Sequence, residues 1–197
     1  MTEEEVNAKI LEMNKEIFAK KLNIDLDRCY DNMNVIFNNV INAFQKDMEL
    51  RIYEISFDSE SILTREEIGF KTNEFFDKLK EYIKNEIIKN KRILMNSINS
   101  QDLENYIGNI EESGINLNNG ISEIYLKEID LLLNDLGRKL DVYSKARLSK
   151  ILKEIIFNHF IERCKATIDS IHTIIINNVH NNTLYLDNMN KSTIKGR

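Results

Sequence analysis

Histidine and cysteine, the side chains that most often bind metals or act as nucleophiles, are few in this chain and far apart. No two of the three histidines, His159, His172 and His180, are four residues apart, the spacing that places two imidazoles against one zinc ion on a helix. The Glu-x-x-His pattern of helical di-iron proteins is absent. Cys29 and Cys164 have no neighbouring histidine in the sequence that would activate a thiolate. The sequence therefore predicts no catalytic residue, no metal and no cofactor. We interpret His159, which follows Phe157 and precedes Phe160, as a partly buried structural side chain.

Motifs that bind nucleotides or nucleic acids are absent as well. The chain has neither G-x-G-x-x-G nor G-x-x-x-x-G-K, the glycine patterns that place backbone amides against phosphates. The segment from Gly114 to Gly120 is rich in glycine and asparagine, but no lysine follows it, so we predict a loop between helices. Residues 1–50 contain no helix-turn-helix pattern. Because the sequence shows no set of residues that would form an active site, an enzyme is not expected.

The distribution of charge is the one feature that suggests a binding surface. Residues 101–136 carry eight acidic residues and one lysine, whereas residues 138–165 carry eight basic and three acidic residues. The candidate side chains for binding a polyanion or a partner are Arg138, Lys139, Lys145, Arg147, Lys150 and Lys153. The two segments either neutralise each other within the molecule, or the basic segment binds nucleic acid, anionic lipid or an acidic partner. We favour neutralisation because the whole chain has a net charge of −5.

The composition favours long, uninterrupted helices. Proline is absent and only six glycines occur in 197 residues, whereas strands, sharp loops and linkers usually need more of both. The chain has 30 isoleucines but only 5 valines, and it has 26 asparagines. This bias is typical of AT-rich coding DNA, as in a low-GC bacterium or in a phage, plasmid or virus of such a host.

The spacing of apolar residues predicts an all-α protein. Apolar residues recur every three or four positions, which places them on one side of a helix. The predicted helices span residues 3–22, 25–57, 65–99, 101–113, 121–141 and 144–180. The helices at 25–57, 65–99 and 144–180 would each be about 50 Å long, and the two between them together match that length. We therefore predict an antiparallel four-helix-bundle-like core with a shorter N-terminal helix beside it.

The ends of these helices carry local signals. Residues 56–61 form a polar cluster that predicts a turn, and Thr64 with Glu67 matches a capping box. In the helix at 3–22, the buried residues are expected to be Val6, Ile10, Met13 and Ile17, with Phe18 and Leu22 beside them. Residues 1–180 are predicted to form one domain, and residues 181–197 a loosely held polar tail. One bent helix over 121–180 stays open as an alternative.

No segment predicts export or membrane insertion. The first residues are acidic and lack the basic and apolar regions of a signal peptide, and no apolar run approaches 18 residues. Two distant cysteines form no disulfide framework and are expected to be buried free thiols. The expected location is the cytoplasm.

Long helices without an identifiable reactive site favour a non-catalytic protein–protein interaction module, such as an adaptor, a scaffold or an inhibitor. Ile36 and Ile41 widen the apolar stripe of the helix at 25–57, which favours self-association and also suits a helix buried among several neighbours. The alternative is a protein that binds nucleic acid or an anionic membrane surface through residues 138–165.

Overall fold

The computed structural model describes residues 1–59 and 63–195, together with the side chains of these ranges up to residue 193. All regular secondary structure in this part of the chain is helical, so the predicted all-α bundle is confirmed. The elements are α1 (Glu3–Asp58), α2 (Arg65–Asn96), α3 (Leu103–Gly137), α4 (Val142–Lys150), the π-helical segment η1 (Ile151–Ile156) and α5 (Phe157–Lys195).

The first helix is much longer than the sequence suggested. The predicted break at residues 23–25 is wrong, because α1 continues from Glu3 to Asp58 without interruption. At its start, Thr2 accepts a hydrogen bond from the backbone of Glu5, whose side chain accepts one from the backbone of Thr2. No proline or glycine occurs in this segment, and polar residues inside a helix do not end it when tertiary packing continues on both sides.

The connection from α1 to α2 begins later than the turn predicted from the sequence. Helix α1 includes residues 56–58 of the predicted turn and Ser59 forms a turn, while residues 60–61 of that prediction lie outside the described residues. The predicted capping box is confirmed: Thr64 accepts a hydrogen bond from the Glu67 backbone, and the Glu67 side chain accepts one from the Thr64 backbone.

Helix α3 overturns the predicted loop at Gly114–Gly120. The helix runs through both glycines, and each of them lies where a neighbouring helix comes close. A Cβ atom on Gly114 would lie 2.7 Å from Nδ1 of His172 on α5, and one on Gly120 would meet the hydroxyl of Tyr82 on α2. The two glycines therefore serve packing between helices, not a turn.

The last part of the chain is one nearly continuous rod. The break that separates it from α3 lies at residues 138–141, and Asp141 caps α4 by accepting a hydrogen bond from the Ser144 backbone at 2.8 Å. The rod continues through η1 and α5 to Lys195, so residues 181–195 of the predicted polar tail are part of a helix. In η1, the Leu152 carbonyl accepts a hydrogen bond of 2.8 Å from the Tyr125 hydroxyl.

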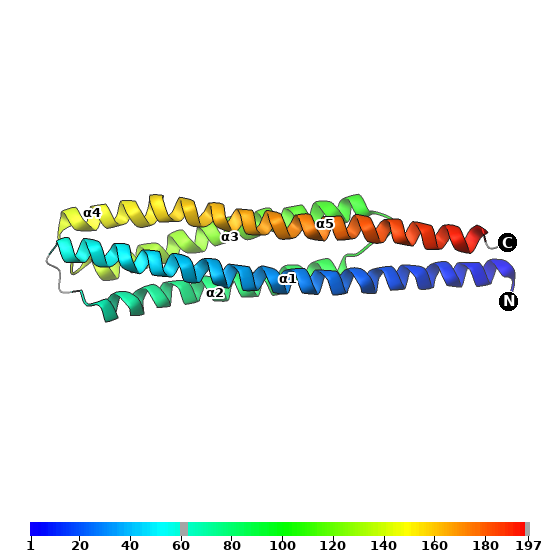
Figure 1. The fold of residues 1–197 in the computed structure, drawn as a ribbon, viewed down its shortest axis with the longest axis horizontal. Helices are drawn as coiled ribbons and strands as arrows, with labels where there is room; N and C mark the ends of the chain where they lie inside the picture. The colour runs from blue at the N-terminus through cyan, green and yellow to red at the C-terminus, as the bar shows by residue number, and fades with distance from the viewer. Residues whose placement is uncertain (60–62, 196–197) are drawn as a thin grey trace.

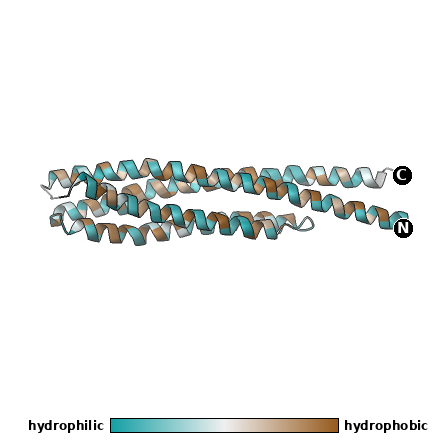
Figure 2. Ribbon diagram, turned by 90° about the horizontal axis from the view of Figure 1, so that it is seen from below, coloured by the Kyte–Doolittle hydropathy of each residue, from teal (hydrophilic) through white to brown (hydrophobic). Residues whose placement is uncertain are grey.

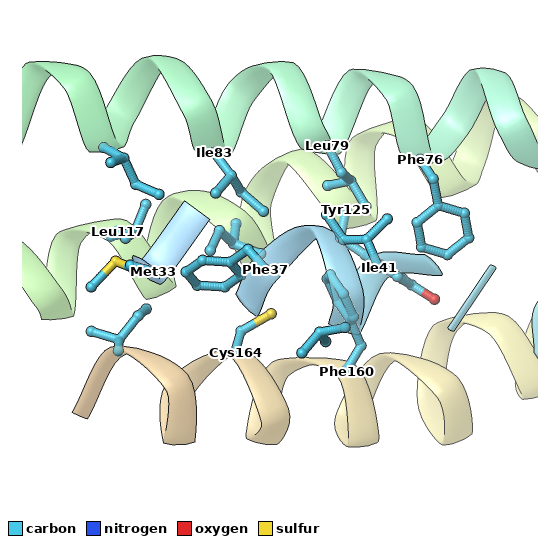
Figure 3. Packing of buried hydrophobic residues seen from close by; sticks show 14 of the residues in the cluster. Met33, Phe37, Ile41, Phe76, Leu79, Ile83, Leu117, Tyr125, Phe160 and Cys164 are labelled. Atoms are coloured by element: carbon cyan, nitrogen blue, oxygen red, sulfur yellow. The ribbon is translucent and has the colours of Figure 1, made fainter. Parts of the chain in front are cut away.

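Four helical rods pack around one core in the wider part of the molecule (Figure 1). Helix α1 packs against α5 and α2, and α3 packs against α2 and α5. Figure 3 shows the centre of the core, where Phe37 of α1, Leu79 of α2, Tyr125 of α3 and Phe160 of α5 point toward one another. Aromatic rings meet there edge to face, as for Phe75 and Tyr125, whose centroids are 5.1 Å apart.

The bundle narrows to two helices at one end. Helices α1 and α5 extend beyond α2 and α3, and both ends of the described chain lie at the far tip of this extension (Figure 1). Lys91, near the end of α2, contacts Asp27 of α1 at 2.7 Å, so the part of α1 before about residue 23 has no α2 beside it. We call residues 3–22 of α1 and 183–195 of α5 the stalk.

Candidate functional site

The six basic residues proposed from the sequence lie at the bundle end opposite the stalk and along α4 and η1, and acids of three other helices engage half of them. Lys139 contacts Glu67 of α2 at 2.5 Å, which lowers the pKa of that carboxyl, and Arg147 contacts Asp58 of α1 at 3.6 Å. Lys153 forms an ion pair with Asp130 of α3. Among the described residues, no ion pair involves the other three, which are Arg138, Lys145 and Lys150.

The acidic segment 101–136 finds most of its partners elsewhere. Asp135 contacts Lys71 at 3.2 Å, and Glu128, almost buried, contacts Lys78 at 2.9 Å. Both lysines belong to α2, so α2 places positive charge beside the acidic face of α3. Of the six candidate basic residues, Lys153 alone pairs with this segment within the part of the chain that the structure describes.

His172 and Tyr30 are two buried titratable side chains that face each other inside the bundle. Nε2 of His172 is 3.5 Å from the Tyr30 hydroxyl, and burial lowers the pKa of His172 to about 4 while raising that of Tyr30 to about 12. His172 lies on one wall of a groove of about 540 Å³ between α3 and α5, whose polar lining includes Asp169 and Lys165. At neutral pH this imidazole is uncharged and weakly basic. The predicted partly buried histidine is wrong, because His159 is exposed and His172 is the one held inside.

The thiols are held in their protonated form. Cys29 and Cys164 are both buried and free, as predicted. Burial raises the pKa of Cys29 and raises that of Cys164 to about 12, so neither supplies a thiolate at neutral pH. Among the described residues, no group of three or more His, Cys, Asp or Glu side chains is arranged to hold a metal ion.

The two helices of the stalk are joined by an interface that mixes apolar and polar contacts. Phe18, Leu22 and Leu186 are buried between α1 and α5. Beside them, Asn14 donates a hydrogen bond of 3.1 Å to Asn190, and just inside the bundle Asn182 donates one of 3.1 Å to Asp25. Buried polar pairs of this kind align two helices in one register, because any shift leaves the amides without partners.

A second set of apolar residues lies on another face of α1, beside the face that contacts α5, and is exposed. We call it the apolar strip, and Figure 2 shows apolar residues recurring along α1 past the ends of α2 and α3. Its members and their exposed fractions are Val6 (40%), Ile10 (36%), Met13 (59%), Ile17 (47%) and Ile24 (60%), of which the first four lie in the stalk and the last lies just beyond it. Their steps of four, three, four and seven residues keep them on one side of a helix. The prediction that the first four are the buried residues of this helix is therefore wrong.

The strip lies on a side of α1 that α5 does not cover. Each of Met13 and Ile17 comes one position before a residue that faces α5, namely Asn14 and Phe18. Because one residue turns a helix by about 100°, the strip faces about 100° away from α5. The strip extends toward α5 through Lys21, whose Nζ lies 4.8 Å from the centre of the exposed Tyr185 ring. Lys21 is four residues from Ile17 and three from Ile24, so Tyr185 borders the strip.

The sequence carried a signal for this surface that a single-stripe interpretation missed. Two apolar sets, one containing Phe18 and Leu22 and the other Ile10 and Ile17, run side by side along residues 3–24. The two residues predicted to widen the apolar stripe of the helix at 25–57 differ in exposure. Ile41 is fully buried in the core, whereas Ile36 is partly exposed.

Comparison with known proteins gives no relatives. No protein-family model matches this sequence, and no curated protein or solved structure is significantly similar to it. Within the described residues, none of the helices contains a stretch long and apolar enough to cross a membrane.

Proposed function

We propose that this chain is a non-catalytic protein-interaction module, an adaptor or scaffold, that binds a helical partner through the apolar strip of its stalk. The observation that carries the proposal is the continuous strip on a two-helix extension. Elsewhere among the described residues, exposed apolar side chains such as Ile93 on α2 stand singly, or form at most a pair at helical spacing, as Leu50 and Phe57 do on α1. Single exposed apolar residues are ordinary, whereas a contiguous apolar surface marks a binding site.

The geometry of the strip suits an amphipathic helix as the partner. In a helical bundle each helix contacts two neighbours, on faces separated by roughly a right angle. Along the stalk, α1 has α5 as one neighbour, and the strip, about 100° away, supplies an apolar face for another. A partner helix would bury its own apolar residues against Met13 and Ile17, in the manner of a helix bound in a groove.

The alternative of polyanion binding through residues 138–165 has less support. Lys139, Arg147 and Lys153 are engaged by acids of the same molecule, and Glu67 and Asp58 bring negative charge to the same end of the bundle. A phosphate backbone would have to compete with those carboxylates for these three side chains.

Site-specific photo-crosslinking tests the proposal. We would replace Met13 by p-benzoylphenylalanine in the full chain, irradiate the cells that naturally make it, and identify the crosslinked adducts by mass spectrometry. The matched control places the same group at Lys15, which is exposed and about 200° from Met13 around the helix. We expect one discrete adduct from position 13 that position 15 does not give, and its re-formation from purified components. Equal labelling from both positions, or none from position 13, would refute the proposal.

A further inference from the structure

We infer that the partner of the apolar strip is a second copy of this chain, whose stalk lies antiparallel to the first. This inference rests on the proposed function, because it assumes that the strip is the binding surface. Two stalks paired in this way would form a short four-helix bundle from two copies of α1 and two of α5. The wide bundles would then lie at opposite ends of one long particle.

The apolar residues of the strip match themselves in this arrangement. An antiparallel pair that places Ile10 opposite Met13 of the other copy also places Val6 opposite the other copy's Ile17. Two-fold symmetry repeats both contacts, so four strip residues from each copy become buried. Antiparallel helices pack well when such residues alternate in steps of three and four, because each side chain then fills the space between those of the other helix.

The charges along the stalk select the antiparallel orientation. Acidic residues Glu3, Glu4 and Glu5 lie at the start of α1, whereas Lys20 and Lys21 lie at the other end of its stalk portion. In the register just described, Glu3 of one copy faces Lys20 of the other, twice. A parallel pair would instead place the three glutamates of one copy beside those of the other, and like charges across a helical interface disfavour that pairing.

The size of the surface sets the expected strength of the dimer. The stalk face extends about 30 Å along α1 and about 20 Å along α5, each about 10 Å wide, so it covers about 500 Å² per copy. A symmetric pair would bury about 1,000 Å², close to the minimum for a specific interface. We therefore expect a concentration-dependent dimer with a Kd on the order of 10 µM.

Sedimentation equilibrium with the full chain tests self-association. The average mass should rise from that of one chain, 23.2 kDa, toward twice that value over the micromolar range. Ile17→Glu and, separately, Met13→Glu should weaken the dimer at least tenfold without changing the helical circular dichroism signal, because both side chains are exposed in one copy. Ile93→Glu is the matched control, since Ile93 is 53% exposed on α2 and its substitution should leave the Kd unchanged.

Disulfide trapping tests the orientation. Val6→Cys and Ile17→Cys are made in separate chains, with Cys29 and Cys164 left in place because both are buried. In the antiparallel dimer, residue 6 lies opposite residue 17, while two copies of residue 6 are about 16 Å apart along the axis, too far for a disulfide. A mixture of the two variants should therefore form a covalent dimer under mild oxidation, and each variant alone should not.

Several results would overturn the inference. A mass of one chain at millimolar concentration, a dimer that survives Ile17→Glu and Met13→Glu, or a disulfide formed by each cysteine variant alone would each do so. The crosslinking at Met13 separates this inference from the proposed function. If Met13 captures a different protein that binds again in purified form, the proposed function stands and the second copy is excluded. If Met13 gives nothing beyond the Lys15 control, both fail.

Discussion

Replacing Gly114 by alanine tests how closely α3 and α5 pack around His172. The new Cβ atom would lie 2.7 Å from Nδ1 and 2.8 Å from Cε1 of His172, and 3.0 Å from Cγ2 of Ile168. His172 and Ile168 are both buried, so the methyl group is accommodated only if the helices separate or the imidazole leaves its position. Overpacking of this kind costs about 1–3 kcal/mol.

Gly108→Ala on the same helix is the matched control. Nothing lies within 4 Å of a Cβ atom at Gly108, so this change should stabilise the protein by about 1 kcal/mol through helix propensity alone. The same propensity gain applies at Gly114, so the difference between the two variants isolates the steric term. We expect Gly114→Ala to be less stable than Gly108→Ala by about 1–3 kcal/mol.

Urea unfolding followed by circular dichroism measures this difference. For a chain of this size, a difference of about 2 kcal/mol also separates the two melting temperatures by about 4–8 °C. Adding His172→Ala to Gly114→Ala should recover much of the loss, because the side chain that the methyl group meets is then gone. Equal stability of the Gly114 and Gly108 variants, within about 0.5 kcal/mol, would refute the close approach of α3 and α5 at this point.

Three further predictions follow from buried and charged side chains. Tyr125→Phe should destabilise the protein by about 1–2 kcal/mol because the Leu152 carbonyl loses its hydrogen-bond donor. Tyr106→Phe should be neutral or stabilising, because the buried Tyr106 hydroxyl has no partner among the described residues. Equal losses of stability in urea unfolding would contradict this prediction. His172 has a pKa lowered by burial from 6.5 to about 4, so the unfolded chain binds the proton more readily. The contribution of neutral His172 to stability is complete above pH 6.5 and falls by up to about 3 kcal/mol as the pH drops toward 4. Urea unfolding of His172→Asn should lack this part of the pH dependence. Changing Lys145, Lys150 and Lys153 to Glu should leave the helical signal unchanged and lower the melting temperature modestly. Of the three, Lys153 alone forms an ion pair among the described residues, and an exposed pair contributes at most about 1 kcal/mol. Binding of the unaltered chain to duplex DNA or anionic vesicles at low salt would instead support the polyanion alternative.

The number and positions of the helix boundaries depended on packing that local sequence does not describe. Thr64 with Glu67 predicted a helix start correctly, because a capping box acts within four residues and needs nothing else from the fold. Gly114 and Gly120 predicted a loop incorrectly. A glycine has two uses, a special backbone conformation or a close approach of another chain segment, and its neighbours in sequence do not distinguish them.

The candidate binding surface shows the same division. The spacing of Val6, Ile10, Met13 and Ile17 correctly placed these residues on one side of a helix. It could not show whether that side was covered, because Phe18 and Leu22 form a second apolar set about 100° away that competes for the same neighbour. Helix α5 reaches this part of α1 only because α4, η1 and α5 form one rod that continues to Lys195, where the polar composition predicted a loose tail.

The sequence by itself determined that the protein is helical, because an apolar period of three to four residues and the absence of proline act through local geometry. It also determined which residues of α2 form the core, such as Phe75, Leu79 and Ile83. Only the tertiary structure decided which of two apolar faces of α1 is buried, and which acids engage Lys139 and Arg147. Burial and ion pairing depend on which helices end early and which continue, and α2 and α3 stop before α1 and α5 do. The strip is exposed because α2, which packs against α1 in the wide part of the bundle, ends before it reaches this part of α1.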